Sequence, residues 1–144
     1  VARSAKPDRE RELGARRVEL DELLERSDVV SLHAPASPET RHLIGAAELE
    51  RMRPHAVLVN TGRGTLVDSA ALARALADGQ IGAAGLDVYE NEPDVPEELL
   101  RAPRCVLLPH IGSATHPARD AMAELAARNA LAVLAGEEPP HRVA

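Results

Sequence analysis

Aromatic side chains are almost absent from this 144-residue sequence, which contains no Phe, no Trp and a single tyrosine, Tyr89. The core must therefore be built from Val, Leu, Ile and Ala. Proteins that bind single-stranded nucleic acid stack the bases on aromatic side chains. A formal net charge of −6 also disfavours a polyanionic partner. We therefore expect no nucleic-acid partner.

Cysteine and long apolar runs are also scarce. Cys105 is the single cysteine, so it forms no internal disulfide, and its place in the apolar run CVLL predicts a buried, reduced side chain. No apolar run reaches the roughly 20 residues that a membrane-spanning helix requires. We expect a cytoplasmic protein with no membrane partner and no bound metal.

Hydrophobic periodicity predicts short strands that alternate with helices. The expected strands are apolar and rich in β-branched residues, and they lie at residues 28–33, 56–60, 81–88 and 105–109. Helical spacing of apolar residues occurs at 18–27, 45–52 and 67–79, and a long helix begins near Pro117 and stops at Gly136. Because parallel strands need helical crossovers, this order predicts an α/β fold with a parallel sheet. The strands are apolar along their length, which is typical of a sheet covered on both faces.

Polar residues follow each expected strand directly. They are His33 and Pro35 after the first strand, Thr61 to Gly64 after the second, Asp87 to Glu92 after the third, and His110 to Ser113 after the fourth. In open α/β sheets, ligands bind beyond the carboxyl ends of the strands. We therefore expect these four segments to form one site.

Three of these residues suggest a reaction class. Arg63 lies between two glycines in the run LVNTGRGTLV, and a guanidinium can bind a carboxylate through two parallel hydrogen bonds. A histidine such as His110, backed by the carboxylate of Glu92, keeps its proton near neutral pH and can donate it to a developing alkoxide. Together they suit a 2-keto or 2-hydroxy acid, with hydride from a cofactor in the same crevice. Taken singly, they have structural alternatives as a surface arginine, a strand-end histidine and a solvated loop acid.

Three separated runs resemble the D-isomer-specific 2-hydroxyacid dehydrogenases, and within that family the glyoxylate/hydroxypyruvate reductases. The runs are LVNTGRGTLVDSAALARAL, GAAGLDVYENEP and LLPHIGSATHPARDAMAELAARNALA, and the resemblance covers essentially the whole chain. It implies that Arg63 binds the substrate carboxylate and keto oxygen. It also implies that Glu92 keeps His110 protonated and that His110 is the general acid/base.

The resemblance also implies a nicotinamide cofactor. Asp87 would hold the nicotinamide carboxamide, with a strand-end cap as its structural alternative. The other residues implied to contact the cofactor are His33, Ala34, Pro35, Thr40, Thr61, Gly62, Arg63, His110, Gly112 and Ser113. Arg3, Ser4 and Lys6 are further candidates, from the kind of side chain found at the start of the chain.

The first residues of the chain bear on which cofactor is used. An NAD site places an acid after the second strand of the domain, whereas basic and hydroxyl groups there suit the 2′-phosphate of NADP. At this position the sequence has Arg3, Ser4 and Lys6 and no acid before Asp8. We expect NADPH to be preferred to NADH. The alternative is that these residues form a solvated basic turn.

The sequence departs from the family in length. Relatives begin with a substrate domain, followed by a strand, a glycine-rich turn and a helix, and these parts are absent from the sequence. The resemblance therefore implies an incomplete Rossmann-like, doubly wound sheet. Residues 1–114 would be the C-terminal part of the dinucleotide-binding domain, and residues 115–144 a long helix and tail that return to the substrate domain. We expect a fragment that has little activity alone and that belongs to a homodimeric parent.

Two other functions stay open from the sequence. The substrate could be 3-phosphoglycerate or another D-2-hydroxy acid, because substrate choice depends largely on the domain that is absent. The alternative of another class is a non-catalytic module that senses a dinucleotide or mediates assembly. Such a module has no need of Arg63, Glu92 and His110 together.

Overall fold

The computed structural model describes residues 4–142 of the chain. The chain divides into two compact units, Val1–Pro109 and His110–Ala144, and each unit is described by itself.

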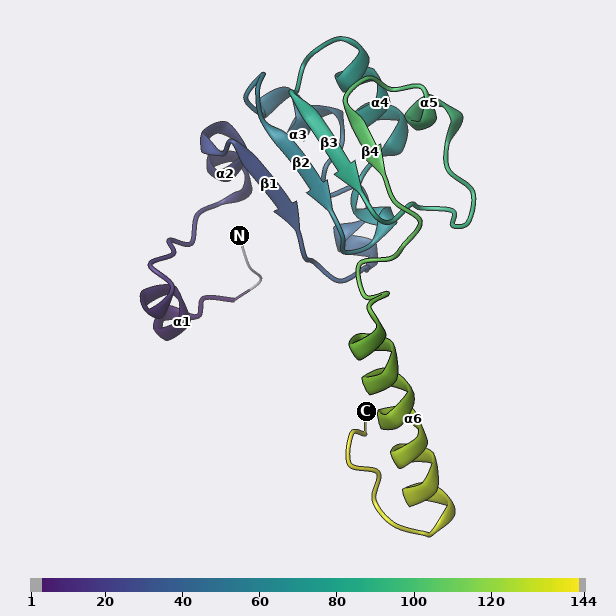
Figure 1. Cartoon of the computed structure of the whole chain (residues 1–144). Coiled ribbons are helices and arrows are strands. Elements are labelled where there is room, and N and C mark those ends of the chain that lie inside the picture. Colours follow the sequence, from purple (N-terminus) through teal and green to yellow (C-terminus); the bar gives the residue numbers. More distant parts are fainter. Residues whose placement is uncertain (1–3, 143–144) are drawn as a thin grey trace. The chain divides into compact units, whose positions relative to one another are not determined.

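The first unit is built on a four-stranded parallel sheet (Figure 1). Its strands are β1 (Val29–Leu32), β2 (Val57–Asn60), β3 (Ala83–Leu86) and β4 (Cys105–Leu107), and they lie side by side in chain order. Each neighbouring pair is parallel. The predicted α/β fold with a parallel sheet is therefore confirmed, with each strand somewhat shorter than its apolar run.

Three helices of this unit lie within the predicted stretches: α2 (Leu20–Arg26), which precedes β1, and α3 (Ala46–Arg51) and α4 (Ser69–Ala77), which connect strands. The unit also contains two helices outside those stretches, α1 (Pro7–Glu12) and α5 (Glu97–Leu100), and two short 3-10 turns, η1 (Pro38–Thr40) and η2 (Gly64–Leu66). Successive helices from α2 to α5 contact one another. The N-terminus of α4 is capped by Asp68, whose carboxylate accepts a hydrogen bond from the backbone N–H of Ala71 at 2.9 Å.

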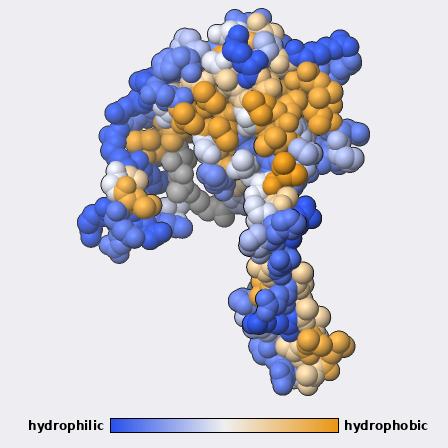
Figure 2. Space-filling view, in the orientation of Figure 1, coloured by the Kyte–Doolittle hydropathy of each residue, from blue (hydrophilic) through white to orange (hydrophobic). Residues whose placement is uncertain are grey.

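Helices α2 to α5 cover one face of the sheet (Figure 1). Side chains that alternate along the strands, such as Leu32, Leu58 and Leu86, are buried in the core. On the other face Val29 and Val106 are 61% and 63% exposed. Figure 2 shows hydrophobic residues gathered over the strands in this view. The continuous apolar sequence of the strands thus serves a core on one face and an apolar surface on the other.

Cys105 is partly buried rather than fully buried, and burial raises the pKa of its thiol. Within the described part of the chain, no helix is both long and apolar enough to cross a membrane.

The second unit consists mainly of α6 (His116–Leu134). Pro117 occupies the first turn, the Thr115 hydroxyl accepts a hydrogen bond from the N–H of Ala118, and Gly136 follows the helix with a φ of 77°. The helix therefore begins and ends where Pro117 and Gly136 predict. Met122 and Leu125 on this helix are 52% and 38% exposed.

Candidate functional site

The register of the sheet aligns the carboxyl ends of its strands. Leu32 pairs with Asn60, Asn60 with Leu86, and Leu86 with Leu107, and each of these residues is the last of its strand. The segments that begin at His33, Thr61 and Asp87 therefore leave the sheet at one level and at one edge. The arrangement expected from the order of the strands is present for these three segments.

The turn that carries Arg63 is held by the side chain of Asn60. Asn60 is 1% exposed; its Nδ2 donates to the carbonyl oxygen of Arg63 at 2.9 Å, and its Oδ1 accepts from the N–H of Gly62 at 3.1 Å. The guanidinium of Arg63 is exposed and donates to the carbonyl oxygen of Gly62 at 2.7 Å. A guanidinium has five N–H donors, so this bond leaves most of its donor capacity for an anion.

Gly64 brings this turn against the segment that follows β3. A Cβ at position 64 would lie 1.9 Å from the carbonyl carbon of Tyr89, 2.0 Å from its oxygen and 2.4 Å from the nitrogen of Glu90. Only a residue without a Cβ allows two backbones to approach this closely. The second glycine of the GRG turn is therefore required by the packing of Arg63 beside the segment that contains Asp87 and Glu92.

The segment after β3 is itself well ordered by hydrogen bonds. Asp87 is 4% exposed, and its backbone N–H donates to the carbonyl oxygen of Asn60 at 3.0 Å. The carboxylate of Glu92 accepts a hydrogen bond from the N–H of Tyr89 at 2.9 Å. Asp87 and Glu92 thus lie on the same short segment, which is attached to β2 by the backbone of Asp87 and to the GRG turn by packing.

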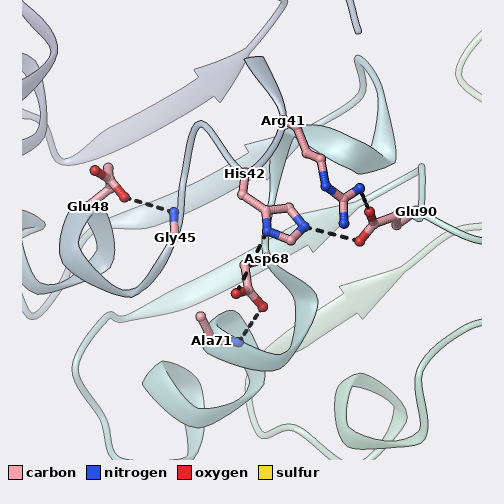
Figure 3. Close-up of polar contacts among 7 residues, drawn as sticks. All are labelled: Arg41, His42, Gly45, Glu48, Asp68, Ala71 and Glu90. Carbon is pink, nitrogen blue, oxygen red and sulfur yellow. Dashed lines mark hydrogen bonds and ion pairs between the residues drawn. The ribbon is translucent and has the colours of Figure 1, made fainter. Parts of the chain in front are cut away.

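A cluster of charged side chains also contacts this segment, through Glu90 (Figure 3). Glu90 forms ion pairs with Arg41 and with Nε2 of His42, the latter at 3.2 Å, and His42 Nδ1 lies 4.0 Å from the carboxylate of Asp68. Burial opposes ionisation of Glu90, but the hydrogen bonds from His42 and Arg41 outweigh it, so the pKa of this carboxyl is lowered. The backbone of His42 has a φ of 51° and its N–H donates to the carbonyl oxygen of Thr65.

A cavity of about 530 Å³ lies at the carboxyl edge of the sheet, between the segment that follows β1 and the segment that follows β2. It is lined by His33, Ala34, Pro35, Ala36, Gly62 and Arg63. The ring of His33 is hydrogen-bonded to the Ser31 hydroxyl at 2.8 Å. Residues predicted to bind the cofactor therefore surround a common cavity with Arg63.

A second cavity, of about 580 Å³, extends along β1. The residues of this cavity that the sequence singled out are Ser4, Lys6, His33, Ala34, Pro35 and Thr40. The hydroxyl of Thr40 donates to the carbonyl oxygen of Pro35 at 2.7 Å, so Thr40 also shapes the loop that carries Pro35. Arg3 lies outside the described residues.

His110, Gly112 and Ser113 belong to the second unit and are described only within it. His110 has a φ of 54°, in the left-handed region that a residue with a Cβ seldom adopts. Among residues 4–142, no group of three or more His, Cys, Asp or Glu side chains is arranged to hold a metal ion.

The roles of three residues that organise the site were not predicted from the sequence. Asn60 is the last residue of an expected strand, and Glu90 lies within the polar segment Asp87 to Glu92 without a role of its own. His42 is not among the residues expected at the site. His42 and Glu90 bond to each other although they lie 48 residues apart in the chain. No local sequence pattern therefore identifies the pair. Asn60 had a local signal, because a polar residue at the buried end of a strand and directly before a turn is a frequent turn former.

Comparisons with known proteins identify the family of the chain. The family model "D-isomer specific 2-hydroxyacid dehydrogenase, NAD binding domain" matches residues 1–112. A glyoxylate reductase from Thermococcus litoralis is 52% identical over 142 residues, which are 99% of this chain and 43% of that protein. The chain therefore spans less than half the length of the curated relatives that it matches.

Two solved structures extend the comparison. An NADPH-dependent glyoxylate/hydroxypyruvate reductase from Sinorhizobium meliloti, in complex with NADP and malonate, is 42% identical with a TM-score of 0.81, over 87% of this chain and 39% of that one. A D-lactate dehydrogenase with NAD+ from Lactobacillus jensenii is 29% identical with a TM-score of 0.86, over 99% of this chain and 47% of that one. Because the family model matches most of its length, the chain belongs to the D-isomer specific 2-hydroxyacid dehydrogenase family, as part of its NAD-binding domain.

Proposed function

We propose that this chain forms the nucleotide-binding side of the active site of an NADPH-dependent reductase of small 2-keto acids, with glyoxylate and hydroxypyruvate as substrates. The observation that carries the proposal is the alignment of the strand ends, which brings the segments of His33, Arg63 and Asp87 to one edge beside a cavity. The glyoxylate reductases among the relatives support the choice of substrate.

Arg63 would bind the substrate. Its guanidinium is exposed at the cavity and is carried by a turn that Asn60 holds rigid. A guanidinium fits a carboxylate through two parallel hydrogen bonds, which fixes the direction of the adjacent keto group. Orientation of this kind lowers the barrier because the reacting atoms need no further search.

His110 would supply the proton and Glu92 would orient its ring. When bound, the nicotinamide supplies the hydride that reduces the keto carbon, and His110 would donate a proton to the oxygen, which gives the 2-hydroxy acid. The carboxylate of Glu92 is held by the N–H of Tyr89, so it offers a fixed acceptor to the imidazole. The left-handed backbone of His110 supports a specialised role, because such strain concentrates at functional sites.

The cofactor would lie along the carboxyl edge. Asp87 would hold the nicotinamide carboxamide, with the backbones of Gly112 and Ser113 nearby. The adenosine half would occupy the cavity along β1, which Ser4 and Lys6 help to line. A lysine and a hydroxyl without a ribose-binding acid suit the 2′-phosphate of NADPH.

The proposal is tested by NADPH oxidation with glyoxylate, using the complete protein with any residues that flank this chain. We expect His110→Ala to lower kcat by roughly 10²- to 10⁴-fold, the usual contribution of a general acid. Arg63→Ala should raise the KM for glyoxylate and lower kcat/KM by at least about 100-fold, with Arg63→Lys intermediate because it keeps the charge but not the paired geometry. Unchanged kinetics in both alanine variants would exclude this mechanism.

The cofactor preference has a separate test. Lys6→Ala combined with Ser4→Ala should raise the KM for NADPH by at least about 100-fold and leave the KM for NADH unchanged, because hydrogen bonds to the charged 2′-phosphate contribute about 1.5–3 kcal/mol each. Wild-type protein that uses NADH more efficiently than NADPH would contradict the preference while leaving the reaction class intact.

A further inference from the structure

Tyr89 contacts all three segments on which the proposed reaction depends. It follows Asp87 and Val88 on the segment after β3, and only 7% of its surface is exposed. As the single aromatic residue of the sequence, it is the largest side chain packed in the hydrophobic core.

The hydroxyl of Tyr89 reaches across to the end of β4. It donates to the carbonyl oxygen of Leu108 at 2.8 Å, and the carbonyl oxygen of Leu86 lies at 3.3 Å. Leu108 precedes His110 by two residues, and its N–H is bonded to the carbonyl oxygen of Leu86 at 2.9 Å. The N–H of Leu108 is thus bonded to β3, and its carbonyl oxygen to the segment that follows β3. Burial raises the pKa of the Tyr89 phenol, which keeps it in the protonated form that can donate.

The backbone of Tyr89 holds the other two segments. Its N–H donates to Oε1 of Glu92 at 2.9 Å. Its carbonyl group packs directly on Gly64, next to Arg63. A displacement of Tyr89 would therefore move Glu92, the GRG turn and the backbone before His110 together.

We propose that Tyr89 is a positioning residue of the reductase, whose hydroxyl fixes the backbone leading to His110 and whose backbone fixes the carboxylate of Glu92 and the turn of Arg63. The inference rests on the proposed function. Tyr89 itself lies in the core and forms no part of the cavity walls described above, so it acts through the residues that it holds.

The test removes the hydroxyl and keeps the ring. In the complete protein, Tyr89→Phe should lower kcat about five- to ten-fold, the effect of losing one hydrogen bond that matters only when His110 transfers its proton. The KM values for glyoxylate and NADPH should stay within about two-fold, because the hydroxyl does not hold Arg63 or the cavity along β1. The basic limb of the kcat–pH profile should move to lower pH, because His110 would be less well aligned with Glu92.

A matched control separates positioning from stability. Arg104 donates to the carbonyl oxygens of Gly82 and Leu76, at the opposite edge of the sheet. Arg104→Met should therefore lower the melting temperature and leave kcat and its pH profile unchanged at temperatures well below melting. If Tyr89→Phe behaves like Arg104→Met, Tyr89 is only structural and the inference is wrong.

The two levels of the proposal fail in different ways. If Arg63→Ala and His110→Ala retain activity, the proposed function fails whatever Tyr89 does. If those variants lose activity and Tyr89→Phe keeps wild-type kcat and pH profile, the positioning role alone is overturned. We expect Tyr89→Phe to have a lower kcat than the wild type and the same melting temperature.

Discussion

Replacing Gly64 by alanine is the sharpest perturbation that the structure offers at the candidate site. The new Cβ would lie 1.9 Å from the carbonyl carbon of Tyr89, whereas carbon atoms in contact are separated by about 3.5–4.0 Å. One backbone would have to move by roughly 1.5–2 Å on that comparison. The atoms in the way belong to main chain, so no side chain can rotate aside. Overpacking in a core costs about 1–3 kcal/mol, and we expect the upper end of that range.

Gly85 provides the matched control for this substitution. A Cβ on Gly85 meets no atom of the described chain within 4 Å, and Gly85 lies in β3 of the same sheet. Thermal unfolding of the 144-residue chain should show Gly64→Ala melting about 10 °C below wild type, at a few degrees per kcal/mol. Gly85→Ala should change stability by less than about 1 kcal/mol. Equal melting of the two variants would show that the GRG turn and the Tyr89 segment are not in the close contact described.

The same substitution should affect catalysis in the complete protein. A misplacement of about 1 Å at a reacting group can cost roughly 100-fold in rate. We therefore expect kcat/KM of Gly64→Ala to fall by about that factor even at temperatures where the variant is folded. Wild-type kcat/KM in folded Gly64→Ala would refute the link between this contact and the position of Arg63.

Three further substitutions test contacts beside the site and at the opposite edge of the sheet. Asn60→Ala removes two buried hydrogen bonds to the GRG turn. Denaturant titrations should show the free energy of unfolding lowered by about 2–3 kcal/mol. A loss below about 0.5 kcal/mol, which is half the net value of one hydrogen bond, would contradict this. The pKa of Glu90 is lowered from its ordinary value of 4.5, so its stabilising effect is present above that pH and is lost as pH falls through the lower folded pKa. Wild type should therefore lose melting temperature more steeply than Glu90→Gln as the pH falls below 4.5, and parallel curves would exclude the effect. Arg104→Met breaks two hydrogen bonds to backbone carbonyls and should lower the free energy of unfolding by about 1–2 kcal/mol. An unchanged free energy of unfolding would show that the guanidinium is only solvated.

The architecture could be predicted because the signals that set it are local. Apolar runs mark the four strands, three of which contain valine, and Pro117 and Gly136 mark the limits of α6. The alternation of strands and helices then favours a parallel sheet, because connections between successive elements are usually short. The convergence of His33, Arg63 and Asp87 at one edge follows from that topology and needs no side-chain detail.

The contacts that hold the site segments in place could not be predicted from the sequence, because they join distant parts of the chain. Glu90 and His42 pair only after β2 and β3 are adjacent, and the need for glycine at position 64 arises only from the backbone of Tyr89. The half-covered sheet is a further case, since an apolar strand has the same sequence whether its second face is buried or exposed. Sequence periodicity reports which residues avoid water and does not report what covers them.

The level alignment of the four strand ends has a consequence for how the protein can change. Side chains alternate between faces along a strand, so inserting one residue in β2 would shift its end by about 3.3 Å and turn the following side chains to the opposite face. Arg63 would then point away from the cavity that it lines. The turns at the other edge, around residues 53–56, 78–82 and 101–104, carry none of the candidate site residues, although Gly82 and His55 are in close backbone contact there. Engineered insertions should therefore disturb the position of Arg63 less at those turns than within the strands.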